Sequence, residues 1–280
     1  MAISSTLRGA LLSSTAAISL LALAACGGDK AGNSALAEKA IVQQNQVKLT
    51  AAGAMNAYAD ALKQNDVRNL VELVSTKVAF EEMKTQFAKM KTEPVSTDER
   101  RQFTESFGRL TAPDAVDSIM KEIEPKLAEY KNQLPGYIAM GAGALQMQVA
   151  NSSVNADEKA SATKAISAMQ TWASKTDFAD PKRARKAVGA LVDAAKSIGL
   201  KTPEDVKALS FEEALDKVGV CLGGFKQALN AYDFDVDAML GSVKATDLAK
   251  PGEVQIKATV FGTELTSKGN LTQREGRWTQ

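Results

Sequence analysis

Hydrophobic residues recur every three or four positions over much of the chain, a spacing that predicts amphipathic helices. One such stretch is formed by Ala51, Met55, Tyr58, Ala59 and Leu62. Asn65-Asp66 interrupts it, and Leu70 and Val74 continue the pattern in a second, short helix. The pattern therefore predicts two helices separated by a break at residues 65–66.

Capping residues and prolines divide the rest of the helical region. The predicted helix starts are Ser96 with Glu99, Asp180 with Pro181, Thr202 with Pro203, and Ser210 with Glu213. Gly199 is expected to end the helix that Pro181 begins. Pro125 lies inside a helical pattern and predicts a kink or a break, whereas Pro135-Gly136 predicts a turn.

Near residue 243 the hydrophobic period changes from 3.6 to 2, which indicates strands. Strands are expected over residues 243–248, 254–260 and 264–272, followed by a turn at Glu275-Gly276. We predict an α+β fold, with a mainly helical body over residues 34–240. A small C-terminal antiparallel β-meander over residues 241–280 is expected to pack on that body.

The N-terminus has the pattern of a secretory signal. A short start with one side-chain charge, Arg8, precedes an apolar or small run over residues 10–25, too short for a lasting membrane span. The segment Leu23-Ala24-Ala25-Cys26 resembles the lipobox of bacterial lipoproteins. The resemblance implies that residues 1–25 are a signal peptide, that cleavage follows Ala25, and that Cys26 carries a diacylglyceryl thioether beside an acylated amine.

The residues after Cys26 indicate in which membrane the protein is anchored. Residues 26–33 lack apolar periodicity and are expected to form a flexible tether. In lipoproteins of enteric-type bacteria, Asp directly after the lipidated Cys retains the protein in the inner membrane, and here that position is Gly27. The resemblance thus implies a lipid anchor in the periplasmic leaflet of the outer membrane rather than in the inner membrane. An ordinary secreted protein is the alternative.

Composition excludes several kinds of chemistry. The 280 residues include no His, so a Ser-His-Asp triad, a His general base and a His-ligated metal are excluded. A formal net charge of +1 gives no broad basic field for nucleic acid. With Cys26 acylated, Cys221 is the remaining thiol, and its neighbours predict a buried small hydrophobe rather than a nucleophile.

Glycine-rich stretches and charged runs are the remaining candidates, and no cofactor motif is among them. Gly141-Ala-Gly143 and the glycines of residues 219–224 predict close helix packing rather than a nucleotide loop. Four cations, Lys182, Arg183, Arg185 and Lys186, lie in the first turns of a predicted helix, where the macrodipole disfavours positive charge. They indicate either a contact site for an acidic protein surface or anionic lipid, or a solvated helix face.

An aspartate cluster has the spacing of a calcium loop. Asp233, Asp235 and Asp237 occupy the first, third and fifth positions, but Ala238 and Lys244 stand where an EF-hand needs Gly and Glu. The competing interpretation is a polar loop in which Asp237 caps the next helical turn. A non-EF calcium site stays open as a weaker hypothesis.

The two ends of the body resemble a known fold. The run from Ala54 to Asp66 and the closing Gly276-Arg277-Trp278 are similar to small exported proteins of the nuclear-transport-factor-like cone fold. That resemblance implies a helical hairpin at the start and strands at the end, and it covers about 50 residues. The helical middle, about residues 80–235, departs from that family's pattern, so no pocket residue is carried over.

Three functional hypotheses follow. The first is a non-catalytic, periplasm-facing lipoprotein that binds a protein or a cell-envelope component. The second is an immunity-type lipoprotein that neutralises an antibacterial toxin, a role favoured by the anchor and the basic run. The third is a glycan hydrolase that works with carboxylates alone, which would need two acids within about 5–10 Å in a cleft.

Overall fold

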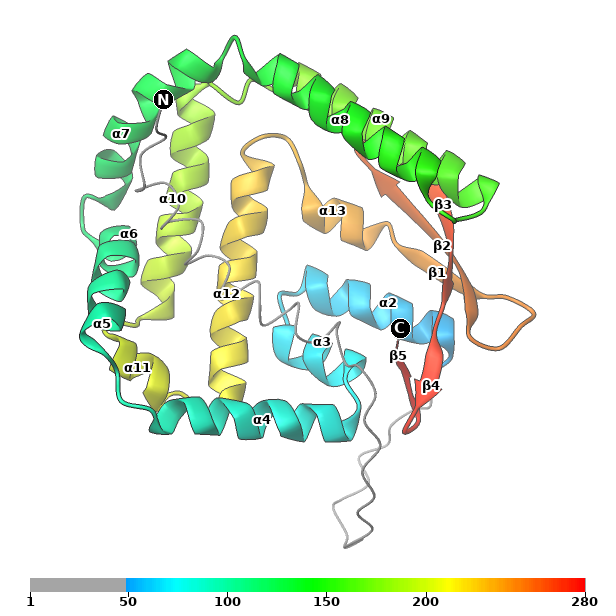
Figure 1. Ribbon diagram of the computed structural model, residues 1–280, viewed down its shortest axis with the longest axis horizontal. Helices are drawn as coiled ribbons and strands as arrows, with labels where there is room; N and C mark the ends of the chain where they lie inside the picture. Colours follow the sequence, from blue (N-terminus) through cyan, green and yellow to red (C-terminus); the bar gives the residue numbers. More distant parts are fainter. Residues whose placement is uncertain (1–48, 280) are drawn as a thin grey trace, which may run out of the picture. The chain divides into compact units, whose positions relative to one another are not determined.

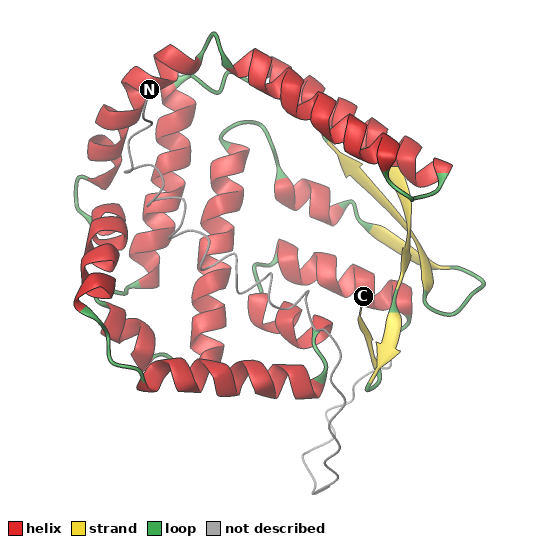
Figure 2. Ribbon diagram, viewed as in Figure 1, coloured by secondary structure: helices red, strands yellow, loops and turns green. Residues whose placement is uncertain are grey.

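Helices make up most of the structure, and strands are confined to its C-terminal part (Figure 2). The computed structural model describes residues 49–279. The predicted signal peptide, Cys26 and the tether lie outside the described residues. The α-helices are α2 (Ala51–Lys63), α3 (Val67–Val74), α4 (Lys77–Thr92), α5 (Thr97–Phe103), α6 (Arg109–Thr111), α7 (Ala115–Tyr130), α8 (Leu134–Asn151), α9 (Ala156–Lys175), α10 (Pro181–Ile198), α11 (Pro203–Ala208), α12 (Phe211–Asn230) and α13 (Val236–Gly241).

Side-chain caps begin several helices where the sequence predicts them. Ser96 and Ser210 each form a reciprocal capping box with the Glu three residues later, and Thr202 does the same with Asp205. Each box satisfies one backbone N–H at the helix start and the N–H of the cap itself. Helix α10 ends at Gly199, whose φ of 74° is in the left-handed region. These local predictions are confirmed.

Neither proline interrupts a helix, so the break allowed for at Pro125 and the turn predicted at Pro135 do not occur. Helix α7 continues through Pro125, which lies on an exposed face where water can reach the carbonyl that loses its hydrogen bond. Pro135 lies in the first turn of α8 rather than in a separate turn, and there its missing N–H removes no intrahelical bond. A π-helical turn, Thr104–Gly108, also connects α5 to α6.

The strands form two antiparallel sheets. The strands are β1 (Lys244–Asp247), β2 (Glu253–Val260), β3 (Thr263–Asn270), β4 (Thr272–Arg274) and β5 (Arg277–Thr279). The first three pair in the order β1-β2-β3, and β4 pairs with β5 separately. The predicted strand over residues 264–272 is thus divided near Leu271, which is buried and donates its N–H to the carbonyl of Gly252. The α+β class is confirmed.

Helix α2 joins the helices to the strands. Its Asn56 side chain receives the N–H of Ala245 at 2.8 Å and donates to the carbonyl of the same residue at 3.3 Å, so it takes the place of a neighbouring strand for β1. Alanines of α2 form a buried cluster with Ala245, Val254 and Leu271. The small alanine side chains let α2 approach the sheet closely.

The two ends that resemble the nuclear-transport-factor-like fold are in contact. The Tyr58 hydroxyl donates to the carbonyl of Trp278. Arg277 donates to the carbonyls of Glu72 and Ser75 at 2.6 and 2.7 Å, at the C-terminal end of α3. The contact places the final hairpin against α2 and α3, and the family resemblance stays a prediction.

A buried lysine connects three helices. Lys226 of α12 is 5% exposed, and its ammonium donates to the carbonyls of Leu62 and Lys63 at 3.1 and 2.9 Å. The same ammonium forms an ion pair with Asp237 of α13. The carbonyls belong to the last turn of α2, where carbonyls lack the usual donor four residues later, and the Leu62 carbonyl also accepts the N–H of Asn65 at 3.2 Å. Lys226 therefore caps α2 and holds α13 beside it.

We predict that Lys226→Met destabilises the fold by about 1–3 kcal/mol, because two carbonyls and one carboxylate lose the donor that the buried Lys226 supplies. The free energy of unfolding is measured by urea denaturation followed by circular dichroism. The matched control, Lys186→Met, replaces an exposed lysine of α10 and is expected to change stability little. Equal stability of the two variants would contradict the capping role.

Candidate binding groove

Helices α10 and α12 lie side by side and share the largest helix–helix contact in the described structure (Figure 1). Small residues bring their backbones together. A Cβ atom added at Gly224 would lie 2.4 Å from the Cβ of Ala194, closer than side chains tolerate. The close packing predicted for the glycines of residues 219–224 is confirmed at this contact. Because no large side chain fills the space beside it, a shallow groove remains.

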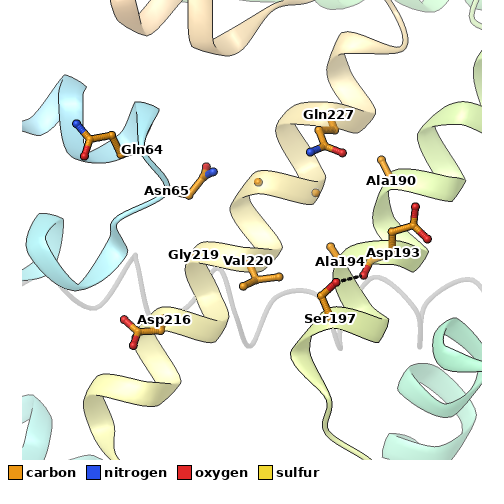
Figure 3. Close-up of a pocket in the computed structure, with 12 residues that line it drawn as sticks. Gln64, Asn65, Ala190, Asp193, Ala194, Ser197, Asp216, Gly219, Val220 and Gln227 are labelled. Atoms are coloured by element: carbon orange, nitrogen blue, oxygen red, sulfur yellow. Dashed lines mark hydrogen bonds between the residues drawn. The ribbon is translucent and has the colours of Figure 1, made fainter.

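The groove has a volume of about 460 Å³ and is shown in Figure 3. Its floor consists of small residues of α10 and α12, and polar side chains stand around it. The polar lining residues are Gln64, Asn65, Asp193, Ser197, Asp216 and Gln227. None of these side chains is a cation, so the groove is suited to ligands with hydrogen-bond donors or positive charge.

Asn65 links the groove to the break between α2 and α3. Its φ of 59° is in the left-handed region, which Asn tolerates better than most residues. A Cβ atom at Gly219 would lie 2.3 Å from the Asn65 carbonyl oxygen, so Gly219 permits this loop to contact α12. The Asn65 Oδ1 is buried and has no hydrogen-bond partner within residues 49–279. One hydrogen-bond acceptor thus remains unsatisfied at the groove wall.

The two carboxylates of the groove do not converge. Asp193 belongs to α10 and Asp216 to α12, and Figure 3 shows their side chains pointing away from each other. Asp216 is held in an ion pair with Arg68 of α3. A glycan hydrolase needs one carboxylic acid and one carboxylate facing the same bond. The arrangement of Asp193 and Asp216 therefore does not favour the glycan-hydrolase hypothesis, and it is compatible with ligand binding.

A second pocket, also of about 460 Å³, lies between α9 and the turn that connects β2 to β3. Phe261 at this turn has a φ of 49°, which is rare for a bulky residue. Its ring stacks on Trp172 at 4.9 Å and on Phe234 at 4.5 Å between ring centroids. These contacts join α9, the turn and the α12–α13 loop. The aromatic rings therefore serve packing between elements, which sequence periodicity did not indicate.

Within residues 49–279, two cations of the predicted basic run form ion pairs with other elements, and two do not. Arg183 donates to the carbonyl of Ala231 at 3.2 Å and forms an ion pair with Asp233 at 2.6 Å. Arg185 pairs with Asp117 of α7 at 2.7 Å. Lys182 and Lys186 are exposed and have no ion pair among the described residues. Two of the four cations thus connect α10 to neighbouring elements, which leaves two for any partner.

We predict opposite effects of reversing two adjacent charges of this run. Arg183→Glu loses a carbonyl contact and an ion pair and is expected to destabilise the fold by about 1–3 kcal/mol. Lys182→Glu places a negative charge near the positive end of the helix dipole and is expected to add about 0.3–1 kcal/mol. Thermal unfolding of both variants measures the difference. Equal melting temperatures would contradict the structural role of Arg183.

The predicted calcium aspartates have three different partners. Asp233 pairs with Arg183, Asp235 accepts the N–H of Ala238 at 2.8 Å, and Asp237 pairs with Lys226. Asp235 rather than Asp237 therefore caps α13. No cluster of three or more metal-ligating side chains occurs in the described part of the chain. The weaker calcium hypothesis gains no support from this arrangement.

Two predictions about small residues were wrong. Cys221 is exposed rather than buried, although partial burial raises the pKa of its thiol, which opposes formation of the nucleophilic thiolate. Gly141 and Gly143 do not mediate close packing within the described part of the chain, because a Cβ atom added at either position meets nothing within 4 Å. Both errors have the same cause: an apolar neighbourhood in the sequence does not identify which face of a helix is covered.

None of the helices in residues 49–279 has the length and hydropathy required to cross a bilayer. Comparison with family models, with curated proteins and with solved structures gave no significant match for this chain.

Proposed function

We propose that the chain is a non-catalytic binding protein of the bacterial cell envelope, tethered through lipidated Cys26 to the periplasmic leaflet of the outer membrane. The groove between α10 and α12 binds a polar segment of a partner protein or of an envelope polymer. The observation that carries this proposal is the groove itself, with amide, hydroxyl and carboxylate groups above a floor of small residues.

The chemistry of the lining supports recognition rather than reaction. Amide side chains such as Gln64 and Gln227 both donate and accept hydrogen bonds, so they suit peptide groups and sugar hydroxyls. Asp193 adds a negative charge that favours amines. The small floor residues admit an extended chain close to the helix backbones, where a bulkier side chain would exclude it.

The proposed tether increases the chance of encounter. Between Cys26 and Thr50 lie 24 residue steps, which reach at most about 80 Å when fully extended. A binding site held this near a membrane meets envelope components at a high effective concentration. Modest affinity in the groove is then sufficient for occupancy.

The immunity-type alternative depends on the basic run. Because Arg183 and Arg185 are engaged in ion pairs, Lys182 and Lys186 alone would have to meet an acidic toxin surface. This arrangement makes the groove the better-supported binding site.

We predict that a photo-reactive side chain in the groove captures the ligand in intact cells. Ser197 is exposed beside Asp193, so Ser197→benzoylphenylalanine is expected to give a discrete adduct after illumination. A protein adduct is recognised by a mass shift, and a glycan adduct by retention on purified peptidoglycan sacculi. Adding Asp193→Arg should lower the yield at least tenfold, because a charge-assisted contact of about 1.5–3 kcal/mol is lost.

The matched control is Ser174→benzoylphenylalanine, at an exposed serine of α9 outside both pockets. Equal adduct yields from positions 197 and 174, or no adduct from position 197, would refute the groove as the binding site.

A further inference from the structure

Helix α8 has an unusual surface for an exposed helix. Its 18 residues, Leu134–Asn151, contain no charged side chain. Within the described structure Ala142 is the one buried residue of this helix, and α9 is its main contact. Met140 and Met147 are each 67% exposed. Exposed apolar side chains on an uncharged helix, with Gln146 and Gln148 as its amide side chains before Asn151, form a surface that a further partner can cover.

The side of α8 opposite its less exposed residues Ile138, Ala142 and Val149 carries a regular pattern. Gly136, Met140, Gly143 and Met147 follow one another at intervals of four, three and four residues. Alternating intervals of three and four residues are the spacing of a coiled-coil seam, in which side chains of one helix fit between those of another. Cβ atoms added at Gly136 and Gly143 would meet nothing within 4 Å, so there is space above both glycines.

The pattern is complementary to itself when it is reversed. Its centre lies between Gly141 and Ala142. When two α8 helices run antiparallel about this centre, Gly136 of one copy lies opposite Met147 of the other, and Met140 lies opposite Gly143. Each large side chain then faces a position that has no side chain, which is the large-to-small alternation that fills a helix interface.

We propose that α8 pairs antiparallel with α8 of a second copy of this chain, across a two-fold axis near residues 141–142. Such an interface is isologous, because the same surface serves both copies. The proposal is independent of the ligand groove, which lies between α10 and α12. The pairing depends on the proposed membrane tether only for its affinity, because the interface that α8 can form is small.

The expected interface is small. Eighteen residues form a helix about 27 Å long, and a contact about 10 Å wide covers roughly 300 Å² on each copy. Stable dimers bury about 1,200–2,000 Å² in total, so α8 by itself supports weak pairing in solution. Copies tethered to one membrane are concentrated in a thin layer, where weak pairing is sufficient.

Charge and composition favour a second copy over a lipid surface. Helices that lie on membranes carry Lys or Arg on one face and Leu, Phe or Trp on the other. The outer face of α8 has none of these cations and presents Gly136 and Gly143, which contribute little apolar area. Pairing two uncharged faces removes no charge from water, so no desolvation penalty for ions opposes it.

Cysteine crosslinking tests the antiparallel register in the full-length chain in intact membranes. All variants carry Cys221→Ser, and cells co-produce Gly136→Cys on one copy and Met147→Cys on the other. We expect copper phenanthroline to link the two variants, because opposite positions lie within disulfide reach of about 7 Å between Cα atoms. Either variant alone should not link to itself, since its two sites would lie about 16 Å apart along the helix.

Charge insertion provides the matched control. Adding Met140→Lys to both variants should reduce the crosslink at least tenfold, because a buried charge costs more than 1.4 kcal/mol. Met90→Lys replaces a 50% exposed methionine of α4 and should leave the crosslink unchanged. Equal total protein on reducing gels confirms that each variant accumulates.

Three results would overturn the proposal. Self-linking of Gly136→Cys would indicate a parallel pair, and the absence of any link between the two variants would exclude pairing of α8 in this register. A crosslink that survives Met140→Lys would place the interface elsewhere. The Cys221→Ser parent retains Cys26 alone, so any crosslink in this parent must form through Cys26. Such a crosslink would contradict the lipid anchor, because an acylated Cys26 has no free thiol, but it would not contradict the α8 pairing.

Discussion

The buried ammonium of Lys226 is the constraint on which the arrangement of helices α2, α12 and α13 depends. It satisfies two carbonyls at the end of α2 and pairs with Asp237 of α13, so α12 is fixed against both helices. On the opposite side, Gly224 brings α12 against Ala194 of α10. One helix thus sets the positions of the loop at Asn65 and of α10, both of which line the groove.

Local signals in the sequence predicted where elements begin and end. Capping pairs such as Ser96 with Glu99 and Ser210 with Glu213 act over three residues, so a short window contains all the information they need. The change to a period of two likewise predicted the strands, because alternation is a property of neighbouring residues. Pro135 was misjudged because the same residue is compatible with a turn and with the first turn of a helix.

The groove and the ion pairs were not predictable in the same way. Arg183 meets Ala231 and Asp233 about 50 residues later, and its role depends on how α10 packs on α12. The glycines at positions 219–224 did indicate close packing, but the sequence did not reveal that Asn65 would form the facing wall. Nothing in the apolar composition of α8 distinguished a buried helix from an exposed one, since burial is decided by what packs against it.

The two proposals rest on three features with separate physical origins: the predicted acylation of Cys26, the polar groove beside α12, and the uncharged helix surface of α8. The proposed anchor raises the effective concentration at which the groove and the α8 surface meet their partners, so weak contacts are sufficient there. Intact-mass spectrometry of the protein purified from its native membranes tests this claim most directly. The account predicts a chain that begins at Cys26 and carries the added mass of a diacylglyceryl group and an N-acyl chain. A chain that retains residues 1–25, or an unmodified Cys26, would contradict it.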